Sequence, residues 1–300
     1  MKKRVAFVRA AMLTVGVLLG GVLSGDGAVS FAESVGALDS GANTTHILYD
    51  NTNGLPTSEA NAIAQTSDGF IWIGSYSGLI RYDGSSFYRF DASTGVASVV
   101  SLFVDSKDRL WIGTNDSGVA KYEDGEFTFF NKNEGLKSSS IRSIAEDKDG
   151  DILIATTQGM AYVSAGSSLH VLDEPQLNDE YIKQLCTSED GDIYGVTVTG
   201  GVFVFDGKRV TSYISSENSG QNVSVNCVCP DPEESDSVYI GTDVNYILKG
   251  SLQGGLKNAK KISTGSLINI NDIEIYGDNI WVCADNGIGR IDKSGSFHIL

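Results

Sequence analysis

Positive charge is scarce in this sequence: its 300 residues include 22 lysines and arginines against 38 aspartates and glutamates. A surface with this excess of negative charge repels nucleic acid and anionic lipid, so we expect neither as a partner. Proline is also rare, with four residues, and like charges do not gather in blocks, which argues against long disordered tails. Apolar residues make up 41% of the chain, which is enough for a core.

Cysteine is nearly as rare, and its four residues lack the spacing of a zinc site. They are Cys186, Cys227, Cys229 and Cys283, all in the second half of the chain. We expect buried thiols that pack as small apolar side chains. A disulfide from Cys186 to Cys227 or Cys229 is the alternative, because an oxidising compartment would permit one.

A long apolar run occurs at the start of the chain, from Ala10 to Leu23, and no later segment has this length. Basic residues precede the run and small residues follow it, which is the pattern of a secretory signal peptide. The run is shorter than the roughly 20 apolar residues that a membrane span needs. We therefore expect a signal peptide at residues 1–32, a linker at 33–44 and an extracytoplasmic mature protein with a net charge of -19.

A repeat of about 40 residues fills the rest of the chain. Its clearest mark is the segment 70–74, Phe-Ile-Trp-Ile-Gly, which returns at 109–113 as Arg-Leu-Trp-Ile-Gly. The anchor residues of six such segments lie 39 to 45 residues apart and are Trp72, Trp111, Leu153, Tyr194, Tyr239 and Trp281. A period of this length, made of short strands, is typical of a β-propeller.

Each repeat has the pattern of four short strands. An alternating strand leads to an acidic turn such as Asp68-Gly69, the anchor strand follows, and a polar loop ends in a glycine such as Gly78. A third strand then reaches a second turn such as Asp83-Gly84 before the fourth strand. Asp-Gly pairs accept the positive φ that tight hairpins require. We predict an all-β fold in residues 45–300, a propeller with six four-stranded antiparallel blades.

The number of blades is predicted to exceed six in the closed ring. Residues 45–49 match a fourth strand, but the first three strands of that blade do not precede them. The sixth repeat already ends with its own fourth strand at Leu300. We therefore expect these six blades to belong to a propeller of seven or more, cut short at the C-terminus.

Histidines do not point to a catalytic or metal site. His46, His170 and His298 all occupy the same slot of the fourth strand, and blades radiate outward, so these residues lie far apart around the rim. The alternating carboxylates Asp147, Asp149 and Asp151 resemble a calcium loop, but Gln158 stands where the bidentate glutamate belongs. We expect an ordinary turn there, and we predict no catalytic residue, metal or cofactor.

The loops between second and third strands are the predicted binding face. Alternating strands send the Asp-Gly turns to one face of the propeller and these polar, varied loops to the other. Surface loops on a rigid scaffold commonly carry binding residues, although they can also be mere solvated connections. The candidate ligand-binding residues are Tyr76, Asn115, Asp116, Gln158, Asp243 and Asp285.

Several runs of the first two repeats resemble the two-component regulator propeller repeat. In the first copy these are Gly54-Leu55-Pro56, the stretches 68–74 and 78–84, and Phe87; in the second copy they are 110–114, 118–122 and Gly135-Leu136. The resemblance implies an extracytoplasmic sensor domain of hybrid or sensor histidine kinases and diguanylate cyclases. Such a domain binds a small molecule or oligosaccharide, or forms a homodimer, and signals through a membrane span further along the chain. It implies no catalysis in this segment.

Two other functions remain open. One is a secreted propeller enzyme acting on polysaccharide, a lyase or glycoside hydrolase with carboxylates along the channel, and the other is an adhesion or scaffold propeller. Paired carboxylates at the separation that glycoside cleavage needs are not visible in the first strands. The residues expected to face the channel include few acids and are mostly Ala60, Ala62, Ser98, Val100, Ser140 and Arg142.

Overall fold

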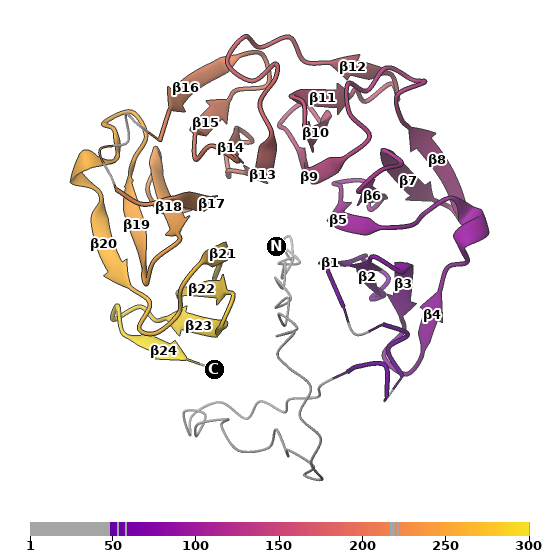
Figure 1. The fold of residues 1–300 in the computed structure, drawn as a ribbon, viewed down its shortest axis with the longest axis horizontal. Helices are drawn as coiled ribbons and strands as arrows, with labels where there is room; N and C mark the ends of the chain where they lie inside the picture. Colours follow the sequence, from indigo (N-terminus) through magenta and orange to yellow (C-terminus); the bar gives the residue numbers. More distant parts are fainter. Residues whose placement is uncertain (1–48, 53, 58, 217–219, 221, 300) are drawn as a thin grey trace, which may run out of the picture.

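Six sheets of four antiparallel strands stand around a common axis as the blades of a propeller (Figure 1). The computed structural model describes residues 49–52, 54–57, 59–216, 220 and 222–299. These residues contain no α-helix, only two short 3-10 turns, η1 (Ala92–Thr94) and η2 (Leu256–Asn258). The predicted all-β propeller with four-stranded blades is therefore confirmed.

Within each blade the strands follow chain order from the axis outward (Figure 1). Blade 1 consists of β1 (Ala62–Gln65), β2 (Ile71–Ser75), β3 (Gly78–Tyr82) and β4 (Phe87–Arg89), and blade 2 of β5 (Val99–Val104), β6 (Leu110–Thr114), β7 (Val119–Glu123) and β8 (Glu126–Phe130). Blade 3 consists of β9 (Ile141–Glu146), β10 (Ile152–Thr156), β11 (Met160–Val163) and β12 (Leu169–Val171), and blade 4 of β13 (Ile182–Thr187), β14 (Ile193–Thr197), β15 (Val202–Phe205) and β16 (Val210–Ile214). Blade 5 consists of β17 (Val225–Pro230), β18 (Ser237–Thr242), β19 (Tyr246–Ser251) and β20 (Lys260–Ser263), and blade 6 of β21 (Ile270–Tyr276), β22 (Asn279–Ala284), β23 (Gly287–Ile291) and β24 (Phe297–Ile299).

Consecutive blades meet through their inner strands, from β1 against β5 to β17 against β21. Blades 1 and 6 stand apart at the opening of the ring in Figure 1. Six blades agree with the number of repeats counted in the sequence. A seventh blade stays a prediction, because residues 45–48, assigned to its outer strand, lie outside the described residues.

The anchor side chains fill the spaces between blades. Trp72 and Trp111 are 2% and 1% exposed, and each packs in a cluster with residues of the following blade. The Trp111 indole donates a hydrogen bond to Asp105 Oδ2 at 2.7 Å. Trp281, in the same slot, is only partly buried, because no described blade follows the sixth. The two buried tryptophans therefore belong to the core.

The described histidines have the predicted position in the middle of an outer strand. The His170 ring stacks on Tyr162 with centroids 4.9 Å apart, and His298 Nε2 lies 2.9 Å from Asp292 Oδ2 in the preceding turn. His46 lies outside the described residues. Asp147 Oδ1 accepts the amide hydrogens of Asp149 and Asp151, so this carboxylate closes a turn.

No disulfide joins any two of the four cysteines, all of which the structure describes, so neither of the possible disulfides forms. Cys227 is fully buried, and Cys186 and Cys229 are partly buried. Burial raises the pKa of both the Cys227 and the Cys229 thiol well above the usual range. Neutral thiols of this kind are poor nucleophiles, which agrees with a packing role.

Candidate functional site

The inner strands of blades 2 to 6 share an irregular spacing of buried residues. Each has two fully buried apolar side chains three positions apart, and both belong to the same interblade cluster. The pairs are Val99 and Leu102, Ile141 and Ile144, Ile182 and Leu185, Val225 and Val228, and Ile270 and Ile273. Regular strand alternation would place residues three apart on opposite faces. Each of these strands must therefore contain one extra residue.

A β-bulge supplies the extra residue in all five strands. In β9, Ile141 pairs with Thr156 and Ser143 pairs with Ala155, so Arg142 has no partner in the ladder. The same shift occurs in β5, β13, β17 and β21. The bulged residues are Val100, Arg142, Lys183, Asn226 and Asn271, which we call the bulge ring. Bulges are over-represented beside functional sites, where they re-aim a side chain.

Glycine in the anchor strand makes room for the bulged neighbour. A Cβ on Gly113 would lie 2.7 Å from Ile141 Cγ2 of the next blade, which is too close for two carbon atoms. A Cβ on Gly241 would likewise lie 3.0 Å from Ile270 Cγ2. The glycine of the Trp-Ile-Gly segment therefore permits the close blade contact on which the bulge is built.

The bulge ring lies on the predicted binding face. The first residue of each bulged strand pairs with the last residue of the anchor strand, as Val99 does with Thr114. The loops that follow the anchor strands therefore stand next to the bulges. Asn115 Oδ1 accepts a hydrogen bond from Arg142 Nη1 at 3.0 Å, and Asp285 Oδ1 accepts one from Asn271 Nδ2 at 2.6 Å.

Arg142 is held by neutral groups. Its Nη2 donates to Ser140 Oγ at 3.0 Å, and its guanidinium carbon lies 5.3 Å from the centre of the Tyr181 ring. The buried Nε has no hydrogen-bond partner. The guanidinium is thus positioned by an amide, a hydroxyl and an aromatic ring.

Lys183 occupies the same position in the next blade. Its Nζ donates to Asn226 Oδ1 at 3.1 Å. The side chain reaches solvent but is surrounded by protein atoms, and this desolvation lowers the pKa of the ammonium despite the opposing fields of Cys227 and Asp285. The charges of Lys183 and Asp285 therefore act on each other across the ring.

The structure brings two of the six predicted residues, Asn115 and Asp285, into contact with the bulge ring. Asp116 accepts a hydrogen bond within its own loop, from Ser117 Oγ at 2.9 Å, and Asp243 accepts one from the amide of Ser224, just before β17, at 3.0 Å. The other two predicted residues, Tyr76 and Gln158, are exposed on their turns. Their part in binding stays a prediction.

Three ring residues were not predicted: Lys183, Asn226 and Asn271. Arg142 was recognised only as a channel residue. The signal that would have identified all four is the pair of apolar residues three apart in successive repeats. A half-buried strand shows separations of two or four, so a separation of three indicates a bulge between them.

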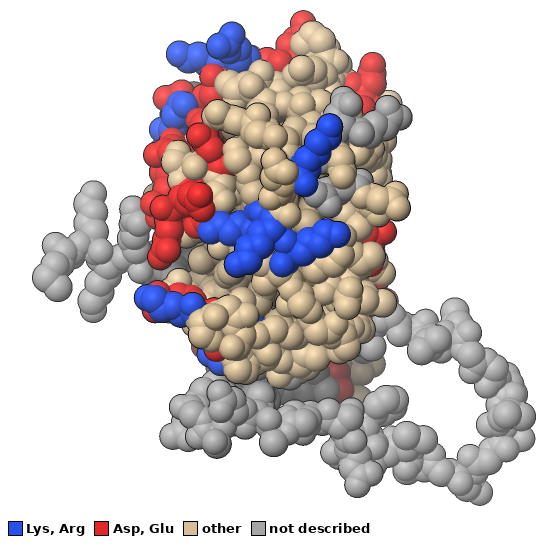
Figure 2. All heavy atoms as spheres, turned by 90° about the vertical axis from the view of Figure 1, so that its left-hand side faces the viewer, with Lys and Arg blue, Asp and Glu red and all other residues tan. Residues whose placement is uncertain are grey.

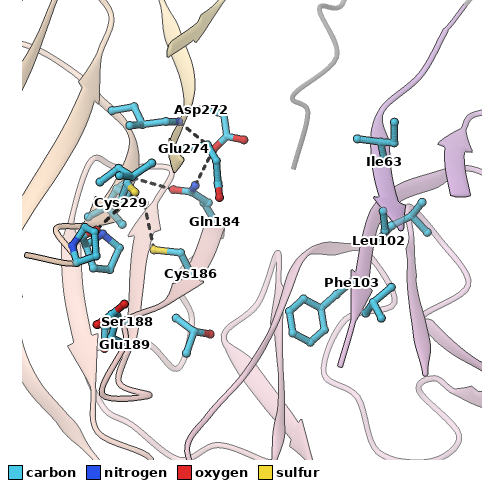
Figure 3. Close-up of a pocket in the computed structure, with 18 residues that line it drawn as sticks. Ile63, Leu102, Phe103, Gln184, Cys186, Ser188, Glu189, Cys229, Asp272 and Glu274 are labelled. Carbon is cyan, nitrogen blue, oxygen red and sulfur yellow. Dashed lines mark hydrogen bonds between the residues drawn. The ribbon is translucent and has the colours of Figure 1, made fainter. Parts of the chain in front are cut away.

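The opposite ends of the inner strands enclose a cavity of about 300 Å³ with two unlike walls. Ile63, Leu102 and Phe103 form an apolar wall, and Figure 3 shows them facing the polar wall across the space. The polar wall includes Gln184, Glu189, Asp272 and Glu274. The expectation that few acids face the channel is therefore wrong for blade 6, whose inner strand contributes Asp272 and Glu274, while Glu189 lies in the turn after the inner strand of blade 4.

Gln184 links three blades between the ring and the cavity. Its Oε1 accepts the Val228 amide hydrogen at 2.8 Å, and its Nε2 donates to Asp272 Oδ1 at 3.3 Å. Ser143 has the same role one blade earlier, where its Oγ accepts the Leu185 amide hydrogen at 3.0 Å. These side chains satisfy the backbone of the next inner strand and hold adjacent blades in register.

Acidic residues gather on the turn side of the propeller. Figure 2 shows Asp and Glu along one edge of the outer wall and Lys and Arg across its middle. The turn between β17 and β18 alone contains Asp231, Glu233, Glu234 and Asp236. The exposed Lys260 and Lys261 belong to β20, the outer strand of this side.

Solved structures with a similar fold include sensor ectodomains and a lyase. The extracellular domains of the putative hybrid two-component system BT3049 and the putative one-component system BT4673, both from B. thetaiotaomicron, have TM-scores of 0.64 with 21% and 18% identity. The matches cover 79% and 82% of this chain but only 34% and 37% of those ectodomains, so the chain spans about a third of their length. A catalytically inactive virginiamycin B lyase from Staphylococcus aureus, solved with quinupristin, has a TM-score of 0.64 at 13% identity, over 79% of this chain and 82% of the lyase.

The propeller fold is common to all three structures, and identities this low show the fold alone. No curated protein matches the chain in sequence. The family model of the two-component regulator propeller matches residues 54–77, 95–116 and 135–158, which confirms the resemblance in the first three repeats. This chain therefore carries the repeat of the two-component regulator propeller family.

Proposed function

We propose that this propeller is the extracytoplasmic ligand-sensing domain of a bacterial signal-transduction receptor, of the sensor kinase or diguanylate cyclase type. The matched repeat and the likeness to sensor ectodomains support a signalling propeller. In this proposal the segment binds a ligand and performs no catalysis. Among the described residues no helix has the length and apolar character needed to cross a bilayer.

The bulge ring is the observation that carries the proposal. A β-bulge repeated at one position in five blades turns amide and cationic side chains toward the binding face. Amide groups can donate and accept hydrogen bonds, as sugar hydroxyls can, and the Tyr181 ring offers an apolar face to a pyranose. We therefore propose an oligosaccharide, bound across Arg142, Lys183, Asn226 and Asn271 with Asn115 and Asp285 beside them.

Two alternatives belong to other classes. The acidic wall of the opposite cavity would suit a secreted enzyme acting on polysaccharide, and the lyase has the same fold. An adhesion or scaffold propeller would bind through its rim. Cleavage of the oligosaccharide would distinguish the enzyme from a sensor. The location of the bound ligand would distinguish an adhesion or scaffold propeller from a sensor.

Calorimetric titration with a panel of oligosaccharides tests the proposal. We expect one or more to bind the protein without being cleaved, and Asn226→Ala to weaken binding about tenfold through the loss of one hydrogen bond. Asn258→Ala, on the exposed rim turn η2, is the matched control and should bind as the parent does. Shortened products in the titration mixture would favour the enzyme, and equal loss in both variants would remove the ring from the site.

A further inference from the structure

We propose that the bulge ring recognises the carboxylate of an acidic oligosaccharide, such as one built from uronic acids, through Arg142 and Lys183. This inference rests on the proposed function and adds the chemical class of the ligand. The two residues occupy the equivalent bulge position in adjacent blades, and their strands, β9 and β13, are in contact. Cations on adjacent blades of one face can together attract an anion.

The chain places no carboxylate in direct contact with either cation, although the charge of Asp285 acts on Lys183 across the ring. Among the described residues, neither Arg142 nor Lys183 takes part in an ion pair. Arg142 donates to the uncharged oxygens of Asn115 and Ser140, and Lys183 donates to the uncharged oxygen of Asn226. The buried Nε of Arg142 also has no hydrogen-bond acceptor.

Two cations elsewhere in this protein, Arg109 and Lys249, are paired with carboxylates. Arg109 is buried against Asp105 with Nε and Oδ2 2.6 Å apart, and Lys249 contacts both Asp231 and Glu234. The chain has 38 acidic residues, so carboxylates are plentiful, yet the ring pairs its two cations with amides and hydroxyls. Neutral acceptors fix the direction of a cation while leaving its charge for a ligand.

Electrostatics also separates the two ends of the inner strands. Glu189, Asp272 and Glu274 line the cavity at the turn end, so an anionic ligand is repelled there. Desolvation disfavours the charged form of Lys183 in the free protein, and a bound carboxylate would favour it again. The loop end also carries Asp285, but it is the end where Arg142 and Lys183 lie, so we expect an acidic oligosaccharide to bind there in preference to the cavity.

The test compares an acid with its neutral counterpart. Trigalacturonate and its fully methyl-esterified form share one skeleton and differ in charge, and both are titrated into the protein by calorimetry. We expect the acid to bind at least tenfold more tightly than the ester. Arg142→Gln and Lys183→Gln should each reduce this preference to threefold or less, because each weakens binding of the acid more than binding of the ester.

Matched controls distinguish the ring from overall charge. Arg209→Gln and Lys257→Gln remove the same charges at exposed positions outside the ring and should keep the tenfold preference. Thermal melting of all four variants checks that they are folded. Equal loss of preference in the ring and control variants would overturn the inference.

The remaining outcomes separate this inference from the proposed function. Equal binding of acid and ester, or binding of neutral oligosaccharides alone, would overturn the carboxylate while leaving oligosaccharide sensing in place. Failure of trigalacturonate, oligoguluronate and hyaluronan tetrasaccharide to bind would also overturn it. Failure of the neutral panel as well would contradict the proposed function.

Discussion

The two ends of the inner strands differ in what their side chains do. At the loop end a bulge interrupts the ladder, and the bulged side chains are released from packing between blades. At the turn end the ladder is regular and polar side chains are committed to structure: Asp105 accepts hydrogen bonds from the Lys107 and Arg109 amides, Arg109 Nε and Trp111 Nε1. One extra residue per strand therefore places a ring of side chains outside the packing between blades, while the apolar pair that flanks each bulge stays buried.

The largest effect should come from removing a structural carboxylate at the turn end. Asp105 is 4% exposed, and Asp105→Ala would leave Arg109 and the Trp111 indole as buried donors without an acceptor. We expect a loss of about 3 to 5 kcal/mol in the free energy of unfolding, measured by urea denaturation. Asp116→Ala, at the exposed loop end, should change stability by about 0.5 kcal/mol or less. If the two variants are equally stable, the proposed difference between the ends is wrong.

A smaller effect should follow from crowding the bulge itself. The Cβ added by Gly113→Ala would lie 2.7 Å from Ile141 Cγ2. Relieving this contact requires β9 to shift. We expect a loss of about 1 to 3 kcal/mol. Gly254→Ala is the control, since no atom lies within 4 Å of its Cβ position. A Gly113→Ala variant as stable as the control would show that the bulge does not depend on this glycine.

Low pH should destabilise the fold through the hairpin turns at the turn end. The pKa values of Asp83 and Asp206 are lowered mainly by hydrogen bonds from the turn amides of Ser85 and Arg209, and that of Asp292 mainly by the Ser294 hydroxyl. These carboxylates have lower pKa values in the folded than in the unfolded chain. Their stabilisation is therefore complete above about pH 4 and is lost as the pH falls through the folded values.

Urea midpoints between pH 6 and pH 2 measure this loss, and Asp83→Asn should flatten part of the acid limb. An unchanged acid limb in a triple variant at Asp83, Asp206 and Asp292 would mean that the turn carboxylates do not stabilise the fold.

The smallest effect should appear at alkaline pH and belong to the loop end. Desolvation lowers the pKa of Lys183, so the charged ammonium costs stability in the folded chain. This cost disappears as the pH rises from the lowered pKa of Lys183 in the folded chain to its pKa in the unfolded chain, about 10.4. Stability should therefore gain a small increment over that window, and Lys183→Gln should abolish it in urea titrations. Persistence of the increment in the variant would assign it to another group.

The sequence alone predicted the parts of the fold that depend on signals within a single repeat. The period of the repeats predicted six blades, the Asp-Gly pairs predicted the hairpin turns, and the shared slot of His170 and His298 placed both on outer strands. Each of these signals lies within one repeat and requires no knowledge of a neighbouring blade.

The candidate site was predicted only in part, because its geometry depends on contacts between blades. Asn115 and Asp285 were found as loop residues, but Lys183 was missed because regular alternation was assumed for the inner strand. The acidic wall at Asp272 and Glu274 was missed for a related reason: which edge of an inner strand faces the axis is set by packing against the adjacent blade.

Mapping where a ligand protects the backbone tests the central claim most directly. Hydrogen exchange is measured on the protein alone and with a saturating oligosaccharide from the titration panel. The account predicts protection at the starts of β9, β13, β17 and β21 and in the loop at Asn115, with little change at the turn ends of the same strands. Protection concentrated around Glu189 and Glu274, with none at Arg142 or Lys183, would contradict it.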